Sequence, residues 1–155
     1  MSKKMKWIVP LVVLLLIGVS WLIARPWKIH GDCMEPAIKG GKRYYANQLA
    51  PYLSNFKVGD IVTFNHEGKP WIARIVALPN DSILIKHHEI IVNNQPSKPI
   101  ARNWEGWNYG TYAINNTLKV PSDSVYVLSD NLSAQHDDSR VFGPIRMTSI
   151  SGRIW

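Results

Sequence analysis

Cys33 is the residue of this chain best suited to nucleophilic chemistry. It lies in the stretch His30-Gly31-Asp32-Cys33-Met34-Glu35-Pro36-Ala37-Ile38. A thiolate attacks carbonyl carbon, and a free thiol with a pKa near 8.5 is about 3% thiolate at pH 7. Because the chain has one cysteine, it can form no internal disulfide and no cysteine-rich metal site. This stretch therefore predicts a nucleophile site, and we expect residues 129 to 143 to fold back against it.

An uncharged apolar run, residues 7 to 24, precedes the cysteine stretch. At about 1.5 Å per residue in a helix, its length approaches the ~30 Å hydrocarbon core of a bilayer. Trp7 and Trp21 lie near its ends, where aromatic rings suit the membrane interface. Three lysines before the run predict a cytoplasmic N-terminus. We expect residues 1 to 24 to form a cytoplasmic tip and a single transmembrane anchor in the cell membrane; a signal peptide cleaved near residues 18 to 20 is the alternative.

The remaining residues, 25 to 155, predict one extracytoplasmic domain made of short strands. Alternating apolar residues between turn residues favour strands rather than helices. The segments expected to contain strands are 43–47, 58–64, 71–78, 82–86, 89–92, 125–128 and 149–155, and residues 96–116 read as a loop or small β extension. The predicted fold class is mostly β, with two packed sheets or a partial barrel behind one N-terminal transmembrane helix.

The charge of the chain argues against a nucleic-acid partner. The formal net charge is +7, from 18 basic and 11 acidic residues. A nucleic-acid binder concentrates its basic residues on one element or face, whereas here they are scattered along the sequence. We therefore expect no nucleic acid among the partners. The apolar run of residues 7 to 24 predicts that a lipid bilayer is one of them.

Four motifs, in order behind the apolar run, resemble those of the bacterial type I signal peptidases. Gly31-Asp32-Cys33-Met34-Glu35-Pro36 is similar to the family's Gly-x-Ser-Met-x-Pro, and Gly59-Asp60-Ile61-Val62 to its Gly-Asp-Ile-Val. The segment 73–81, Ala-Arg-Ile-Val-Ala-Leu-Pro-Asn-Asp, is similar to Lys-Arg-Val-Ile-Gly-Leu-Pro-Gly-Asp. Ser129-Asp130-Asn131 with Asp138-Ser139-Arg140 and Gly143 is similar to the Gly-Asp-Asn…Asp-Ser-Arg…Gly box, with serine in place of its first glycine.

The resemblance implies a β-rich peptidase-like domain at the outer face of the membrane. It implies signal peptides of exported preproteins as partners, cleavage after small residues, and no metal or cofactor. In this family an uncharged lysine activates a serine, because a hydroxyl needs a base within hydrogen-bond reach and a lysine acts as one when burial lowers its pKa. Both residues differ here: Cys33 stands at the serine position and Ala73 at the lysine position.

His136 is the candidate replacement for the missing base. It lies two residues before Asp138, where the resemblance places a serine that contacts the lysine amine. An imidazole entering the space beside Ala73 would give a Cys–His pair, an arrangement known on other folds. The alternative is that His136 is a solvated loop residue.

Other positions predict how a substrate would bind and how the site is held. The resemblance assigns Ile29, Met34, Ile38 and Ile72 to the substrate pocket; ordinary core packing is the alternative for each. It assigns site-supporting roles to Gly31, Asp130, Asp138 and Arg140. Residues 71 to 73 match the strand edge along which an extended substrate adds, and the Cys33 backbone N–H would contribute to an oxyanion hole.

Two functions remain open at this point. One is a signal peptidase-like enzyme that uses Cys33. The other is a non-catalytic relative that binds secreted or pilin-like clients as an assembly factor. The sequence also leaves open a purely structural membrane-anchored domain, and whether the two replacements are natural or introduced.

Overall fold

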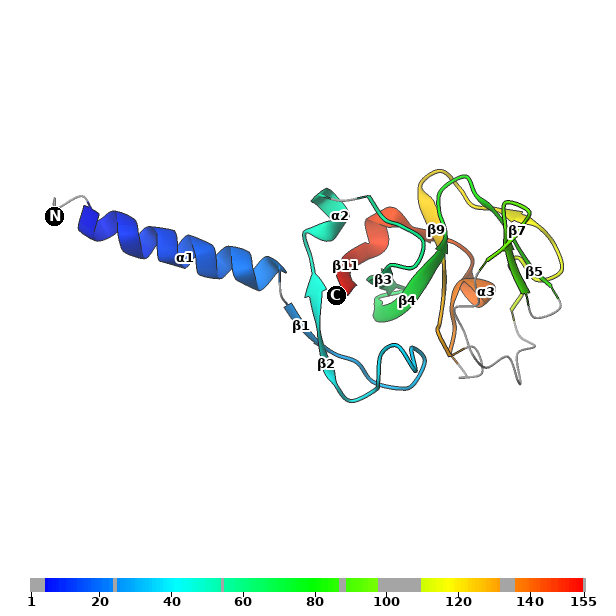
Figure 1. Ribbon diagram of the computed structural model, residues 1–155, viewed down its shortest axis with the longest axis horizontal. Helices are drawn as coiled ribbons and strands as arrows, with labels where there is room; N and C mark the ends of the chain where they lie inside the picture. Colours follow the sequence, from blue (N-terminus) through cyan, green and yellow to red (C-terminus); the bar gives the residue numbers. More distant parts are fainter. Residues whose placement is uncertain are drawn as a thin grey trace.

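The computed structural model describes residues 5–23, 25–53, 55–86, 89–97, 110–131 and 136–154. Most of the predicted extension, residues 98 to 109, lies outside these ranges. The chain begins with a helix that projects away from a β-rich domain (Figure 1).

The projecting helix is α1 (Met5–Ile23). Its large apolar side chains are exposed, among them Trp7 (80%), Leu14 (67%) and Trp21 (68%). None of the helices in the described ranges is long and apolar enough to cross a membrane, so the predicted transmembrane anchor is not supported.

The larger of two sheets carries most of the domain. Its seven strands run in the spatial order β1-β2-β11-β3-β4-β9-β10, and every pair in it is antiparallel. The strands are β1 (Arg25–Lys28), β2 (Arg43–Asn47), β3 (Ile61–His66), β4 (Lys69–Ala77), β9 (Ser124–Leu128), β10 (Ile145–Arg146) and β11 (Ile150–Ile154).

The smaller sheet has the order β7-β6-β5-β8 and is also antiparallel. It comprises β5 (Ser82–Lys86), β6 (Glu89–Val92), β7 (Gln95–Pro96) and β8 (Leu118–Lys119). Three short helical turns complete the domain: α2 (Ala50–Leu53), α3 (Ser139–Phe142) and the 3-10 turn η1 (Met147–Ser149). The expectation of a mostly β domain with two sheets is confirmed.

The hairpin β3–β4 forms because its turn residues accept an unusual backbone conformation. Glu67 and Gly68 both have positive φ, 51° and 76°, and the flanking His66 and Lys69 pair directly. Two central residues with positive φ define the turn whose twist matches antiparallel strands. The two strands therefore extend beyond the expected segments 58–64 and 71–78, and only Glu67 and Gly68 lie between them.

Alternation along β4 divides the core into separate packed clusters. Ala73 and Ile75 point into one cluster with Val125 and Val127 of β9, while Ile72, directly before Ala73, points into another with Cys33. Adjacent side chains on a strand face opposite sides of a sheet, so β4 serves both clusters. A third cluster, around Ile83 and Ile85, packs the smaller sheet against the larger one through Val76, Ala77 and Tyr126.

Candidate active site

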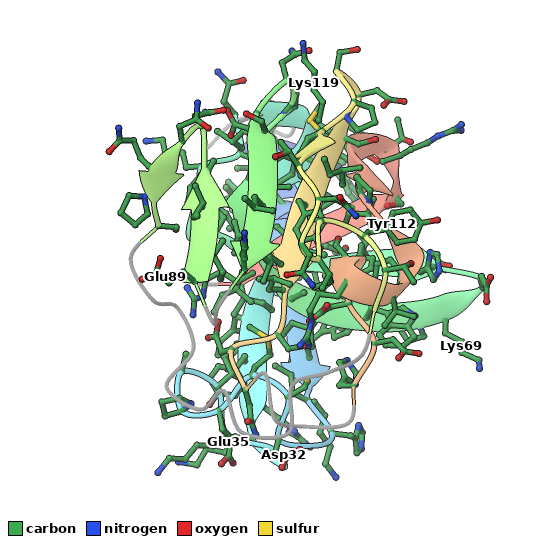
Figure 2. The ribbon with its side chains drawn as sticks, turned by 90° about the vertical axis from the view of Figure 1, so that its right-hand side faces the viewer. Asp32, Glu35, Lys69, Glu89, Tyr112 and Lys119 are labelled. Atoms are coloured by element: carbon green, nitrogen blue, oxygen red, sulfur yellow. The ribbon has the colours of Figure 1, made fainter. Side chains whose placement is uncertain are left out.

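The Cys33 stretch forms a tight turn at one end of the domain. Within it, the Glu35 amide donates to the Asp32 carbonyl (3.0 Å) and the Ile38 amide to the Met34 carbonyl (2.8 Å). Figure 2 shows Asp32 and Glu35 at the lower end of the domain, far from Lys119 at the upper end.

Two glycines allow this turn to close on itself. Gly31 has φ +86°, a region that favours glycine. A Cβ at Gly40 would lie 2.3 Å from the Gly31 carbonyl oxygen, so a side chain there cannot be accommodated. A supporting role for Gly31 would thus come from its backbone conformation. Gly40 is needed for the same turn because it has no side chain, and sequence analysis did not select it.

The predicted pocket residues come together around Cys33. Ile29, Met34, Ile38 and Ile72 pack in one cluster with Cys33, Ala46 and Ile154. All are nearly inaccessible, from 0% exposed for Met34 to 8% for Ile154, and Cys33 itself is 3% exposed. Such complete burial is what the alternative, ordinary core packing, predicts for these residues.

The environment of Cys33 disfavours its thiolate. Burial first, and then the negative charges of Asp32 and Asp130, raise the pKa of the thiol to about 11, although hydrogen bonds from the backbone N–H groups of Cys33 and Met34 act in the opposite direction. At pH 7 a pKa of 11 leaves on the order of 0.01% thiolate, against about 3% for a free thiol. The nucleophile position is therefore occupied by an almost entirely protonated group.

Ala73 offers no acceptor for a proton, and it faces away from the Cys33 cluster. It is 2% exposed and packs with Val62, Phe64 and Ile75. β3 pairs along one edge of β4, and β9 pairs along the other edge at Arg74, Ile75 and Ala77. Among the described strands, none pairs with residues 69 to 73 on the edge that faces β9. This free edge is the one where residues 71 to 73 were expected to take up an extended peptide.

His136 lies beside β4, on the face that carries Ala73. Its ring is 4.9 Å from that of Trp71, two residues before Ala73 and therefore on the same side of the strand. Burial lowers the pKa of His136 below 6.5, although Asp138 and Asp137 act in the opposite direction. The histidine is half-buried rather than a fully solvated loop residue, and its imidazole is neutral near pH 7.

The segment that begins at Ser129 folds back onto the cysteine turn, as predicted. The backbone N–H of Asn131 donates to the Cys33 carbonyl (2.8 Å), and its side-chain amide donates to the Asp32 carbonyl (3.3 Å). These contacts join residues about one hundred positions apart in the sequence. Asn131 is a site residue that sequence analysis did not select, although it lies within the fourth motif.

Asp138 and Arg140 form a buried ion pair that shapes the returning segment. Arg140 Nε and Nη2 donate to the two Asp138 carboxylate oxygens at 2.7 and 2.8 Å, and both side chains are at most 1% exposed. The same carboxylate caps α3 by accepting the Arg140 backbone N–H (3.0 Å) and also accepts the Ser129 N–H (3.1 Å). Asp138 therefore connects both ends of the loop.

A second ion pair links three of the four motifs. Arg74 Nε donates to Asp130 Oδ1 (2.7 Å), its Nη2 bonds Oδ2, and its Nη1 donates to the Gly59 carbonyl (2.7 Å). Asp130 was expected to support the site, whereas its partner was not identified. Arg74 directly follows Ala73 in the third motif, and this position could have identified it as a site residue.

A cleft of about 420 Å³ lies between β1 and the β3–β4 hairpin. Trp27 and Pro26 line one side, Phe64 and Pro70 another, and Arg25, Lys28, Gln48, Asn65 and Ser151 complete the lining. The cleft is mixed in character, with two basic residues among aromatic and small polar ones. It adjoins β4 near the start of the edge described above.

Comparison with known proteins agrees with this architecture. The chain matches the family model described as signal peptidase, peptidase S26, over residues 1–155. A signal peptidase I of Bacillus amyloliquefaciens is 30% identical over 152 residues, covering 95% of this chain and 82% of that protein. Signal peptidase I S of Bacillus subtilis is 28% identical over 155 residues, covering 95% and 83%.

A solved structure shares the fold. The signal peptidase I from Enterococcus faecalis superposes with a TM-score of 0.54 at 23% identity, covering 66% of this chain and 98% of that one. The family match, the curated relatives and the shared fold agree with the two-sheet domain. The chain belongs to the signal peptidase family, peptidase S26.

Proposed function

We propose that this protein binds the signal peptides of exported preproteins and holds them without cleaving them. The observation that carries the proposal is the state of Cys33: its thiol is buried, its pKa is raised to about 11, and the position of the family's base is Ala73. An enzyme of this type needs an activated nucleophile and a base within hydrogen-bond reach. Neither requirement is met at these two positions, whereas main-chain pairing of a peptide with the edge of β4 needs neither group.

The peptide would add to the free edge of β4 as an extended strand. Main-chain hydrogen bonds give such a complex its affinity, and pockets for alternate side chains give it specificity. Ile72 would present the apolar Cys33 cluster to a small side chain, and the cleft beside Trp27 would take residues further along the peptide. This is a binding site that needs no proton transfer.

A second candidate is a peptidase that uses Cys33 with His136 as base. It is favoured by the position of His136 against Trp71 and by its lowered pKa, because a neutral imidazole is able to accept a proton. Cleavage that depends on both residues would establish this candidate instead of the first.

We further propose that α1 attaches the domain to the outer face of the cell membrane. Its exposed side chains, Trp7 and Leu14 among them, present an apolar surface along the helix. Exposed apolar surface of this extent is costly in water and favourable in a bilayer. The domain would then lie where exported preproteins emerge.

Fluorescence anisotropy with a labelled signal peptide tests the binding proposal. The full chain in phospholipid nanodiscs is titrated against a peptide with a small residue before its cleavage position. We expect saturable binding that weakens at least tenfold when the peptide backbone is N-methylated where it would pair with β4, and when Ile72 is replaced by Ala. Tyr52→Ala, at an exposed position outside the cluster, is the control. Equal affinity for the native and N-methylated peptides would refute addition to the edge.

A further inference from the structure

The arginines of β1 and β2 differ from the other described arginines in their surroundings. Arg25 on β1 and Arg43 on β2 are exposed, and neither forms an ion pair with a described residue. The remaining arginines in the described ranges all lie against aspartates: Arg74 with Asp130, Arg140 with Asp138, Arg146 with Asp123, and Arg153 with Asp60. A guanidinium stays charged at any ordinary pH and matches the geometry of a carboxylate. The β1–β2 pair therefore carries positive charge that the described fold leaves uncompensated.

The register of β1 and β2 places Lys28 directly opposite Arg43. Directly opposite residues share a face and have Cβ atoms about 5 Å apart, so like charges in this arrangement destabilise a sheet. By contrast, Lys86 and Glu89 lie directly opposite in β5 and β6 and carry opposite charges. Within the part of the chain that the structure describes, no acidic side chain pairs with Lys28. An anion placed beside Lys28 and Arg43 would relieve their repulsion.

Lys28 and Arg43 point away from the Cys33 cluster. Trp27, Ile29 and Tyr44, their neighbours in the sequence, all pack against that cluster. Adjacent side chains on a strand face opposite sides, so Lys28 and Arg43 lie on the outer face of the sheet. A bound peptide strand alternates in the same way. If its small residue faces the Cys33 cluster, the residue directly before it faces outward, on the side of these two cations.

The cleft between β1 and the β3–β4 hairpin brings a bound peptide close to the cations. All four residues of β1 line the cleft, so β1 presents to it the edge that pairs with no described strand. The lining includes two basic residues, Arg25 and Lys28, and no acidic one. Since Lys28 lies on the cleft proposed to hold the peptide, the carboxylate best placed to approach it belongs to that peptide.

We propose that Lys28 and Arg43 form an anion-binding surface that selects clients with a glutamate or aspartate directly before the small residue. The inference rests on the proposed binding of signal peptides along β4, and it names a class of client within that function. The peptide carboxylate would lie on the outer face beside the ammonium of Lys28, and the guanidinium of Arg43 is able to hold it through two parallel hydrogen bonds. Such charge complementarity contributes specificity more than raw affinity.

Anisotropy with a matched pair of labelled signal peptides tests the selection. The peptides are identical except for glutamate or glutamine directly before the small residue. They are titrated against the full chain in phosphatidylcholine nanodiscs, which carry no net charge. In 0.1 M NaCl we expect the glutamate peptide to bind roughly fivefold more tightly, as two exposed ion pairs allow. In 1 M NaCl, where the Debye length falls to about 3 Å, the two affinities should agree within about twofold.

The variant Lys28→Gln/Arg43→Gln should lose the preference for glutamate. Its affinities for the two peptides should agree within about twofold, at unchanged affinity for the glutamine peptide. Its Tm should not fall, because the substitutions remove a contact between like charges. The matched control is Lys119→Gln, which removes an exposed lysine at the opposite end of the domain from the cysteine turn (Figure 2) and should keep the full preference. A preference that survives in the double variant, or that the control loses as well, would overturn the proposal.

Other outcomes separate this inference from the proposed function. Saturable and equal binding of both peptides by the native chain would overturn the selection and leave peptide binding intact. Binding of neither peptide would overturn both. The native chain and the double variant are also floated with phosphatidylglycerol and phosphatidylcholine vesicles. If the native chain binds the two peptides equally, and only the double variant loses a preference for phosphatidylglycerol, the cations bind anionic lipid and the proposal is wrong.

Discussion

Alkylation of Cys33 measures the thiolate that any attack on a peptide bond would require. With its pKa raised to about 11, the thiol should react with iodoacetamide roughly 300-fold more slowly at pH 7 than a free thiol does. The rate should rise about tenfold per pH unit from 7 to 10 without levelling near 9, because thiolate is still accumulating. The urea-unfolded chain, in which the burial is removed, should level off near pH 9. A plateau below pH 8 in the folded protein would show an activated cysteine.

The same experiment with His136→Ala tests the second candidate. If the imidazole is not paired with Cys33, the alkylation rate and its pH profile stay unchanged within about twofold. A drop in rate confined to neutral pH would show that His136 activates the thiol.

His136 should also make the fold sensitive to acid. Its pKa is lowered in the folded protein, so between that value and 6.5 the unfolded chain binds more protons than the folded one. Stability is therefore lost as the pH falls below about 6.5. The Tm of the native protein should fall more between pH 7.5 and 5.5 than that of His136→Gln, measured by circular dichroism. Identical pH profiles would show that the imidazole is not buried.

At the residue scale, the motifs predict where the site lies, and the structure adds the burial and charge around each residue. Cys33, Ala73 and the four apolar pocket residues all follow from the resemblance to the family. The raised pKa of Cys33 and the almost complete burial of Ser129 depend on three-dimensional packing, which local sequence does not encode. The contact of His136 with Trp71 depends likewise on how a loop folds over β4.

Among the elements, the returning segment depends most on the ion pair of Asp138 and Arg140. Removing one member of a buried pair leaves an uncompensated charge, and Asp138→Asn should reduce the unfolding free energy by about 3–5 kcal/mol. The matched control is Asp123→Asn, which removes an exposed, 3.9 Å pair with Arg146 and should change stability by less than about 1 kcal/mol. Urea denaturation of both variants measures the difference. Equal effects would mean that the loop is held by other contacts.

Strand prediction succeeded where hydrophobic alternation was strong. β2, β5 and β6 have the predicted bounds, and β3, β4, β9 and β11 differ by a few residues at their ends. β1 is absent from the expected strands, because Arg25–Lys28 contains a proline and two basic residues; it forms at the edge of the sheet, paired with β2. Such composition is common on edge strands, and it gives no alternating pattern to detect. The four-residue α3 inside a predicted loop is set by its Asp138 cap.

On the scale of the whole molecule, α1 should determine where the protein resides. The native chain should float with phospholipid vesicles in a density gradient, because the exposed apolar side chains of α1 gain by entering the bilayer. Replacing both Leu11 and Leu14 by Glu should release most of the protein. Tyr52→Glu, at an exposed position of the domain, should leave flotation unchanged. Release by Tyr52→Glu alone would place the membrane contact on the domain instead.

The fate of a bound signal peptide tests the central claim most directly. The full chain in nanodiscs is incubated with saturating peptide at pH 7.5, and the peptide is followed by mass spectrometry over many hours beside a Cys33→Ala variant. The account predicts that both proteins bind the peptide and return it intact. A fragment ending in the small residue, formed by the native chain and absent with Cys33→Ala, would contradict it and establish a working cysteine peptidase.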